Sequence, residues 1–392
     1  MEFIDVKNED VLTIGLKGHI DSTNADKVEA EINEARLGNE EKHLVIDAQN
    51  LEYISSAGLR VILRLKKADN DLKVINTSSE VYEIFDITGF TEMMNVEKAY
   101  RQVSVDGCEV IGQGANGIVY RIDPDTIVKM YYDTNALHEI QRERELARTA
   151  LILGIPTAIP YDVVRVGDGY GSVYELLNAT SFAKMLINDP SKLDEVAHMS
   201  VDLLKKIHGT LVKPGVMPDE KEIVLNWAKF LKDYLPQEAY DKLYRLIDEV
   251  PEDTHMLHGD YHIKNVMMQN DEVLLIDMDT LCVGNPIFEF GSIYNAYQGY
   301  SELDHENIKN FLGITFEMGK EFWDKTLHLY FDDKSEEEIQ DIANRAMLLG
   351  HTRIMRRTIR RNGFDTEEGR AIIENSKSKI LELLEKINTL AI

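Results

Sequence analysis

The segment "HGDYHIKNVM" (258–267) gathers several side chains that can bind a metal or transfer a proton. Asp260 and Asn265 lie five residues apart in it, and Asp277 follows in the stretch "LLIDMDT". Two chemistries would use such a set. A metal-dependent hydrolase would take Asp260 and the two flanking histidines as ligands. Phosphoryl transfer would use Asp260 to orient an attacking hydroxyl, and the oxygens of Asn265 and Asp277 to hold Mg²⁺.

A glycine-rich turn upstream favours the second chemistry. The stretch "GQGANGIV" fits the pattern G-x-G-x-x-G with Gly112, Gly114 and Gly117, and a glycine backbone can approach a phosphate closely. The strand-like segments "IVYRI" and "TIVKMYY" follow, whereas a dinucleotide-binding turn leads into a helix. We therefore expect a hairpin over a nucleotide, with Lys129 on the next strand reaching the α- and β-phosphates.

A glutamate that pairs with this lysine is expected on the helical run that follows (135–156). Three glutamates are available there, Glu139, Glu143 and Glu145. We select Glu143 because Leu146 continues an apolar stripe behind it. The alternative is that all three glutamates form a solvated, salt-bridged face.

The glycine hairpin and the lysine decide between the two chemistries. A hydrolase would give neither of them a role, whereas phosphoryl transfer uses the whole set. In that case His258 and His262 are supporting or packing residues, as single histidines usually are.

Bulk composition bounds the class of protein. A chain of 392 residues, 44% hydrophobic and 29% charged, is typical of a globular protein with two or three domains. The net charge of −26 argues against binding nucleic acid or anionic lipid, and no run of about 18 apolar residues predicts a membrane span. Cys108 and Cys282 have no metal-type spacing, and the amino terminus has no targeting signal, so we expect a cytoplasmic protein.

The first 104 residues alternate strand and helix patterns, which predicts an α/β unit with a small sheet covered by helices. We place the domain boundary near residue 105, giving domains at 1–104 and 105–392. The expected strands are 11–20, 42–48 and 72–77, and the expected helices are 24–36, 56–70 and 80–88.

With these motifs assembled, residues 105–392 resemble the aminoglycoside phosphotransferase and choline kinase-like family, which is related to protein kinases. The resemblance rests on "GQGANGIV", Lys129, "HGDYHIKN" and "LLIDMDT" in this order. It implies an α+β bilobal protein-kinase-like fold, with an N-lobe at about 105–178 and a C-lobe at about 179–392.

The resemblance also implies roles for single residues. Asp260 would be the catalytic aspartate, and Asn265 and Asp277 would bind Mg²⁺. ATP would be bound by Gly112, Gly114, Gly117, Lys129 and Glu143, and by the hinge "VYELLN" with Glu175 and Leu177. The sequence departs from the family where many members have a leucine and a proline, here Tyr261 and Ile263, which leaves the acid and the amide in place.

The first unit resembles STAS domains of the anti-sigma factor antagonist type. The resemblance covers "VLTIGLKGHIDSTNADKVEAEI", "HLVIDAQNLEYISSAGLRVIL" and "ITGF". It implies a partner such as an anti-sigma factor, and a regulatory phosphorylation site at Ser56. Ser55 stands where many members have an aspartate, so either hydroxyl is arguable, and a serine here also suits a helix N-cap.

One further feature is the arginine-rich stretch "HTRIMRRTIRRNGF" (351–364). On a helix its five arginines would share one face. This face would bind a phosphorylated or carboxylated substrate, or dock the acidic first domain, or be a solvated face balanced by acids such as those in "KSEEEIQD".

The sequence thus predicts an ATP- and Mg²⁺-dependent phosphotransferase that acts on a hydroxyl of a small molecule and carries a regulatory STAS domain. One alternative is a nucleotide-sensing protein that acts through the STAS domain in partner switching. The other is a protein kinase, although "DMDTLCVGNPIFEFG" contains neither D-F-G nor A-P-E.

Overall fold

The computed structural model describes residues 2–9, 11–39, 41–114, 116–134 and 136–392. These residues form two compact units. The first comprises Met1–Ser104 with Val164–Gly167, and the second comprises Val105–Val163 with Asp168–Ile392.

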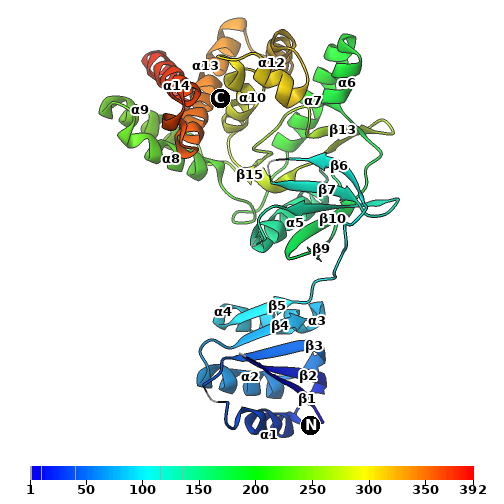
Figure 1. Ribbon diagram of the computed structural model, residues 1–392. Helices are drawn as coiled ribbons and strands as arrows, with labels where there is room; N and C mark the ends of the chain where they lie inside the picture. The colour runs from blue at the N-terminus through cyan, green and yellow to red at the C-terminus, as the bar shows by residue number, and fades with distance from the viewer. Residues whose placement is uncertain (1, 10, 40, 115, 135) are drawn as a thin grey trace. The chain divides into compact units, whose positions relative to one another are not determined.

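The first unit is a five-stranded sheet in the order β1-β2-β3-β4-β5, drawn in blue to cyan in Figure 1. β1 is antiparallel to β2, and the remaining neighbours are parallel. The strands are β1 (Ile4–Asn8), β2 (Leu12–Ile20), β3 (Leu44–Ile54), β4 (Lys73–Thr77) and β5 (Asn95–Lys98), and the helices are α1 (Ala25–Arg36), α2 (Ser56–Ala68), α3 (Ser79–Ile87) and α4 (Phe90–Met93).

The strand and helix periodicities of this unit meet in one core. β2 alternates buried and less buried residues, and α1 contributes Val28 and Ile32 from one face. The sheet with helices that the sequence predicts is confirmed. Sequence periodicity does not predict β1 and β5, because each strand buries only one residue, Ile4 in β1 and Val96 in β5, and so shows no alternation of buried and exposed residues.

The second unit begins with a sheet in the order β6-β7-β8-β10-β9. β6 is antiparallel to β7, β7 is antiparallel to β8, and β8 is antiparallel to β10. The helix α5 (Leu137–Ile152) follows β8 in the chain. The strands are β6 (Glu109–Gln113), β7 (Gly117–Arg121), β8 (Thr126–Tyr131), β9 (Pro160–Val166) and β10 (Gly169–Glu175). The last three residues of β9, from Val164 on, are grouped with the first unit.

The rest of the second unit is mainly helical and carries small sheets. Its helices are α6 (Phe182–Asn188), α7 (Leu193–His208), α8 (Glu220–Phe230), α9 (Gln237–Asp248), α10 (Pro286–Tyr297), α11 (Glu306–Leu312), α12 (Phe316–Tyr330), α13 (Glu336–Arg360) and α14 (Glu367–Lys386), with 3₁₀ turns η1 (Pro190–Lys192), η2 (Leu231–Asp233), η3 (Met278–Thr280), η4 (Gly299–Ser301) and η5 (Gly363–Asp365). The short strands are β11 (Thr180–Ser181), β12 (Met256–Leu257), β13 (Val266–Gln269), β14 (Glu272–Leu275) and β15 (Cys282–Val283).

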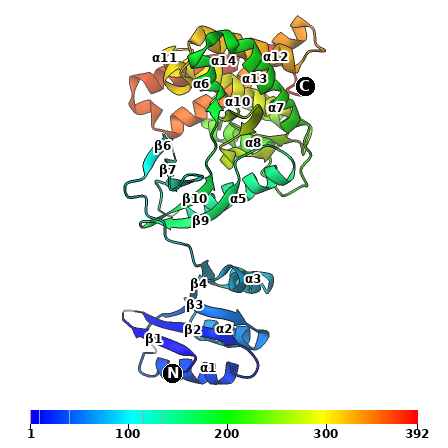
Figure 2. The ribbon, with the colours of Figure 1, turned by 90° about the vertical axis from the view of Figure 1, so that its right-hand side faces the viewer.

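The centre of this helical region is α10, a helix that is buried on all sides. It packs against α13, as both views show (Figures 1 and 2). Small residues allow the close approach: a Cβ added to Gly291 would lie 2.8 Å from Leu349 Cβ. Asn295 Nδ2 donates to the Gly350 carbonyl at 3.1 Å across the same contact.

Among the described residues, no helix is long and apolar enough to cross a membrane.

We predict that Gly291→Ala destabilises the second unit by about 1–3 kcal/mol, because the new methyl group overpacks the contact between α10 and α13. At an unobstructed helix position the same change stabilises by roughly 0.5–1 kcal/mol, so the sign is diagnostic. Urea unfolding followed by tryptophan fluorescence measures it, since both tryptophans, Trp227 and Trp323, belong to this unit. The exposed helical change Ser378→Ala is the control, and equal midpoints for the two variants would contradict this packing.

Candidate active site

The three glycines of the motif lie at the end of β6, in the turn that follows it and at the start of β7, and they have different environments. A Cβ on Gly117 would lie 2.1 Å from the Met130 carbonyl of β8, so the sheet itself requires a glycine there. A Cβ on Gly114 would meet no described atom within 4 Å, which leaves the backbone at this point open to a ligand. Gly112 has only ordinary contacts with Val119, and Ala115 of the same turn lies outside the described residues.

Lys129 on β8 and Glu143 on α5 form a close ion pair. Lys129 Nζ lies 2.9 and 3.2 Å from the two carboxylate oxygens of Glu143. Tyr131 and Tyr174 donate their hydroxyl groups to the same carboxylate at 2.5 and 3.2 Å. Glu143 is only 5% exposed, so the solvated-face alternative does not hold for it, whereas Glu139 and Glu145 are exposed.

Lys129 also reaches a loop far away in the sequence. Its Nζ lies 3.3 Å from Asp277 Oδ1. Burial would lower the pKa of Lys129, but the negative charges of Glu143 and Asp277 raise it above its ordinary value. Asp277 has a left-handed backbone with φ of 65°, at the start of η3. Asn116 of the glycine turn donates to Asp279 Oδ2 at 3.4 Å, so turn, lysine and loop converge.

Asp260 lies in the loop between β12 and β13 and has two basic neighbours. His262 Nε2 is 3.5 Å from Asp260 Oδ2, and Arg353 Nη2 is 3.9 Å from Asp260 Oδ1. Burial alone would raise the pKa of Asp260, but the hydrogen bond and charge of His262, and then the charge of Arg353, lower it below its ordinary value. Asp260 is therefore a carboxylate at neutral pH.

Groups that the sequence analysis did not single out hold this loop. Glu289 of α10 is fully buried and accepts the backbone N–H groups of His258 and Gly259 at 2.5 and 3.0 Å. In the next peptide unit, Ser292 Oγ donates to the Gly259 carbonyl at 3.0 Å. An acid inside the apolar run "NPIFEFG" is the signal that would have identified Glu289, because buried acids are rare unless they are paired.

Asn265, Asp277 and Asp279 supply the oxygen atoms that suit Mg²⁺. The Asn265 amide nitrogen is used, since Nδ2 donates to the Asp260 carbonyl at 3.1 Å, so its Oδ1 is the atom left for a metal. Burial, and then the negative charges of Asp277 and Glu143, raise the pKa of Asp279. This accumulated negative charge is what a divalent cation neutralises, so the residues fit the metal.

The two histidines do not form a metal site with Asp260. His258 Nδ1 accepts the Asp260 N–H at 3.3 Å, and its Nε2 lies 3.3 Å from the Ile276 carbonyl. Among the described residues, His258, Asp260 and His262 do not bring three ligand atoms within 4.8 Å of one another, so the hydrolase alternative lacks its ligand set.

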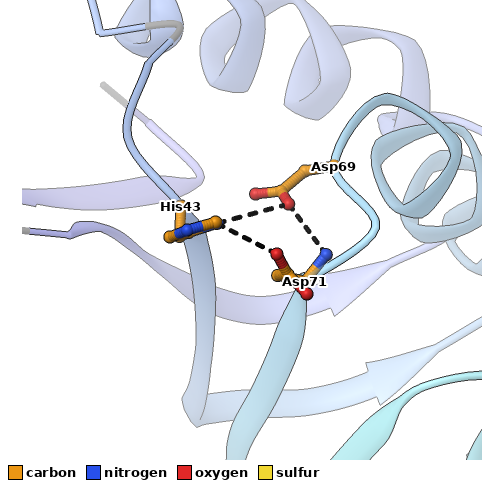
Figure 3. Close-up of side chains that lie close together, drawn as sticks. All are labelled: His43, Asp69 and Asp71. Atoms are coloured by element: carbon orange, nitrogen blue, oxygen red, sulfur yellow. Dashed lines mark hydrogen bonds and ion pairs between the residues drawn. The ribbon is translucent and has the colours of Figure 1, made fainter.

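One group of histidine and acidic residues with metal-like spacing occurs among the described residues, and it lies in the first unit. Figure 3 shows His43, Asp69 and Asp71 facing one another. Asp69 accepts the backbone N–H groups of Leu44 and Asp71 at 2.7 and 2.9 Å. These bonds join the turn after α2 to the start of β3, which explains the group as a structural feature.

The hinge residues lie at the end of the first sheet of the second unit. Glu175 ends β10 and donates its N–H to the Ile159 carbonyl at 3.1 Å. Leu177 follows it and is half-buried.

The two serines at the start of α2 differ. Ser55 is the N-cap, and its Oγ accepts from the N–H groups of Ala57 and Gly58 at 3.2 and 3.5 Å. Ser56 is the first helical residue and is exposed.

Comparison with known proteins accounts for both units. Residues 107–320 match the profile described as the phosphotransferase enzyme family, and residues 3–103 match that of the STAS domain. A Bordetella bronchiseptica protein assigned as the anti-sigma factor antagonist BtrV is 36% identical over 94 residues, which is 23% of this chain and 80% of that protein. The anti-sigma F factor antagonist of Paenibacillus polymyxa is 29% identical over 90 residues, 22% of this chain and 77% of that protein.

A solved structure, the apo form of a thermostable mutant of the aminoglycoside phosphotransferase APH(4)-Ia, shares the fold of the second unit. It has a TM-score of 0.50 and 12% identity, and the match covers 71% of this chain and 94% of that chain. The expected fold class, an α/β STAS domain followed by a kinase-like α+β domain, is thus confirmed. The chain belongs to the phosphotransferase enzyme family and carries an amino-terminal STAS domain of the anti-sigma factor antagonist type.

Proposed function

We propose that the second unit transfers the γ-phosphoryl group of ATP to a hydroxyl group of a small molecule, with Mg²⁺ as cofactor. The observation that carries the proposal is the ion-pair cluster of Lys129, Glu143 and Asp277. It joins a strand, a helix and a loop at one point, which is the arrangement that phosphoryl transfer by kinases needs. In this proposal the domains are residues 1–104 and 105–392, with the lobes meeting near residue 178.

The nucleotide would be bound mainly by the first sheet and α5. Lys129 would hold the α- and β-phosphates, and Glu143 would keep the lysine charged and extended toward them. The open backbone at Gly114 allows the turn to close over the phosphates. The remaining ATP-binding residues in this proposal are Gly112, Gly117, Glu175 and Leu177.

Asp260 would accept a hydrogen bond from the acceptor hydroxyl and orient it for attack. Its lowered pKa keeps it ionised, so its role is to position the hydroxyl rather than to remove a proton beforehand. Glu289 and Ser292 fix the peptide that carries Asp260, and thereby fix the direction of the carboxylate.

Asn265 and Asp277 would hold the magnesium ion, which when bound neutralises charge on the transferred phosphoryl group. Lys129, the proposed phosphate ligand, contacts Asp277, the proposed metal ligand, so one contact fixes the position of both side chains. Asp279 is close enough to Asp277 for their charges to interact, and it can add a further oxygen.

A small acceptor is favoured over a protein acceptor by the chain length after the metal loop. η3 ends at Thr280 and α10 begins at Pro286, so no more than five residues lie between them. A protein kinase needs a longer activation segment there to bind its peptide substrate. The protein would act in the cytoplasm, where a cysteine such as the buried Cys282 stays reduced.

The first unit would bind a protein partner such as an anti-sigma factor, and phosphorylation of Ser56 would control that binding. Ser55 already uses its hydroxyl as a cap, whereas the Ser56 hydroxyl is exposed at the helix start. Backbone N–H groups at a helix start tolerate a phosphate, whose added charge of about −1.5 to −2 would change what the surface binds.

For the catalytic aspartate, we predict that Asp260→Asn lowers kcat by at least about 100-fold, because the neutral amide lacks the negative charge that holds and orients the acceptor hydroxyl group. Binding of Mg-ATP should stay within about twofold, since the phosphate contacts remain. A panel of hydroxyl-bearing metabolites and aminoglycosides, assayed by ATP consumption and intact mass, identifies the acceptor for this measurement. Asp248→Asn, an exposed acid on α9, is the control, and full activity of Asp260→Asn would refute the assignment.

For the ion pair, Glu143→Gln should weaken Lys129 as a phosphate ligand by about 1.5–3 kcal/mol, or roughly 10- to 100-fold in kcat/KM for ATP. The effect is expected in ATP kinetics rather than in acceptor KM. Glu139→Gln and Glu145→Gln on the same helix change the charge equally at exposed positions and serve as matched controls. Equal kinetics for all three variants would mean that the buried pair has no part in ATP binding.

For regulation, we predict phosphate on Ser56 and not on Ser55 when the protein is isolated from its cells. Phosphopeptide mapping of wild type, Ser55→Ala and Ser56→Ala measures this directly. Pure protein incubated with Mg-ATP, beside Asp260→Asn, separates self-modification from a second kinase. Phosphate that persists in Ser56→Ala, or is absent from every sample, would rule out the switch at this serine.

A further inference from the structure

The arginine-rich part of α13 does not form a single solvated face. Arg353, Arg356 and Arg360 follow one another at i, i+3 and i+7, which places them along one side of the helix. Arg353 and Arg356 are half-buried, and Arg360 is exposed. These three residues, called the arginine strip below, thus run from the interior of the unit to its surface.

The inner end of the strip contacts the loop that carries Asp260. Arg353 Nη1 donates to the Gly259 carbonyl at 3.1 Å and to Ser292 Oγ at 2.8 Å. Its guanidinium also lies over the Trp227 ring of α8, 5.6 Å from the centroid. The strip therefore starts at the proposed catalytic residue.

The middle residue of the strip, Arg356, lies beside two further positive charges, those of Arg353 and Arg360. Arg356 lies over the same Trp227 ring, 5.9 Å from the centroid. Its Nε is buried and has no hydrogen-bond partner in the part of the chain that the structure describes. Burial, and then the positive charges of Arg360 and Arg353, lower the pKa of Arg356. Like charges held together at a half-buried position are unfavourable unless an anion joins them.

Three of the four acids that were expected to balance this face contact other residues. In the stretch 334–341, Glu336 pairs with His328, the Glu338 carboxylate accepts the Ser335 N–H, and Asp341 pairs with Arg345. Asp341 is also twelve residues before Arg353, roughly 18 Å along the helix. Among the described residues, no carboxylate pairs with Arg356 or Arg360 within 4 Å.

A pocket of about 190 Å³ lies beside the inner end of the strip. Its wall includes Trp227, Arg353 and Gly259, together with the acids Glu220 and Asp279. A molecule in this pocket would touch both the loop of Asp260 and the aromatic ring on which the two arginines lie. Arg356 and Arg360 are not part of its wall, so an anionic group on that molecule would extend from the pocket along the Trp227 ring to reach them.

We propose that the acceptor carries an anionic group, a phosphate or a carboxylate, which binds Arg356 and Arg360 while its hydroxyl group lies at Asp260. The inference rests on the proposed phosphotransferase function and gives the chemical class of its acceptor. Guanidinium groups bind such oxyanions through two parallel hydrogen bonds, which makes a pair of neighbouring arginines a suitable anion site. Arg353 would lie between the anion and Asp260 as a positioning residue.

The first experiment measures anion binding with inorganic phosphate and with acetate as probes. Trp227 fluorescence is titrated in full-length protein with a non-hydrolysable ATP analogue present, and Trp227→Phe verifies the origin of the signal. The double variant Arg356→Ala/Arg360→Ala should lose at least about 90% of the affinity for phosphate. Arg148→Ala/Arg245→Ala removes the same charge at exposed positions and should bind as wild type does. Equal binding by both double variants would overturn the proposal.

The second experiment compares polyols and sugars with their own phosphate or carboxylate derivatives as acceptors. We expect transfer to favour the anionic member of a pair, and the double variant Arg356→Ala/Arg360→Ala to raise its KM at least about tenfold while KM for ATP stays within about twofold. Equal use of neutral and anionic acceptors, or an unchanged acceptor KM, would overturn the anion site while the phosphotransferase function stands. Absence of transfer to every acceptor, with intact phosphate binding, would instead remove the proposed function.

Discussion

The buried carboxylate of Glu143 is the constraint on which the site depends. A charge that is 5% exposed must be paired, and removing one partner of such a pair costs about 3–5 kcal/mol. Two tyrosine hydroxyls and Lys129 satisfy it, so β8, β10 and α5 can pack in only one relative position. Lys129 has a third contact, with Asp277, which brings the metal loop to the same place. Structural stability and the geometry for phosphate binding thus come from the same bonds.

A second constraint fixes the direction in which Asp260 points. Three successive peptide units before Asp260 are held. Glu289 accepts the N–H groups of His258 and Gly259, while Ser292 and Arg353 donate to the Gly259 carbonyl. Gly259 has φ of +79°, and a Cβ there would lie 2.5 Å from the Thr280 carbonyl, so no other residue fits. The loop is therefore set by the contact between α10 and α13, which explains why small residues occur where these helices meet.

The sequence predicted what short-range patterns can reveal. Helical and strand periodicity located α1, α2 and β2, and the motif spacings brought together Lys129, Glu143 and Asp277. It did not reveal residues whose role comes from contacts across the chain. Arg353 lies 94 residues from Gly259, and nothing near it in the sequence distinguishes it from the other arginines. Likewise the glycine motif did not show that Gly117 is required by packing against β8 while Gly114 is open.

The arginine strip also has to be reconciled with a net charge of −26. Such a charge repels anions, but at physiological ionic strength the repulsion fades over about 8 Å. Arg353 and Arg360 are seven residues apart, roughly 10 Å along α13. An anion bound to the strip is therefore close to its positive charges, while most of the negative charges of the chain are screened. The positive charges of Arg353 and Arg360 act on Arg356 at a half-buried position, where like charges repel one another. An oxyanion bound to the strip offsets this repulsion, which makes the strip selective for an oxyanion over a neutral group of the same size.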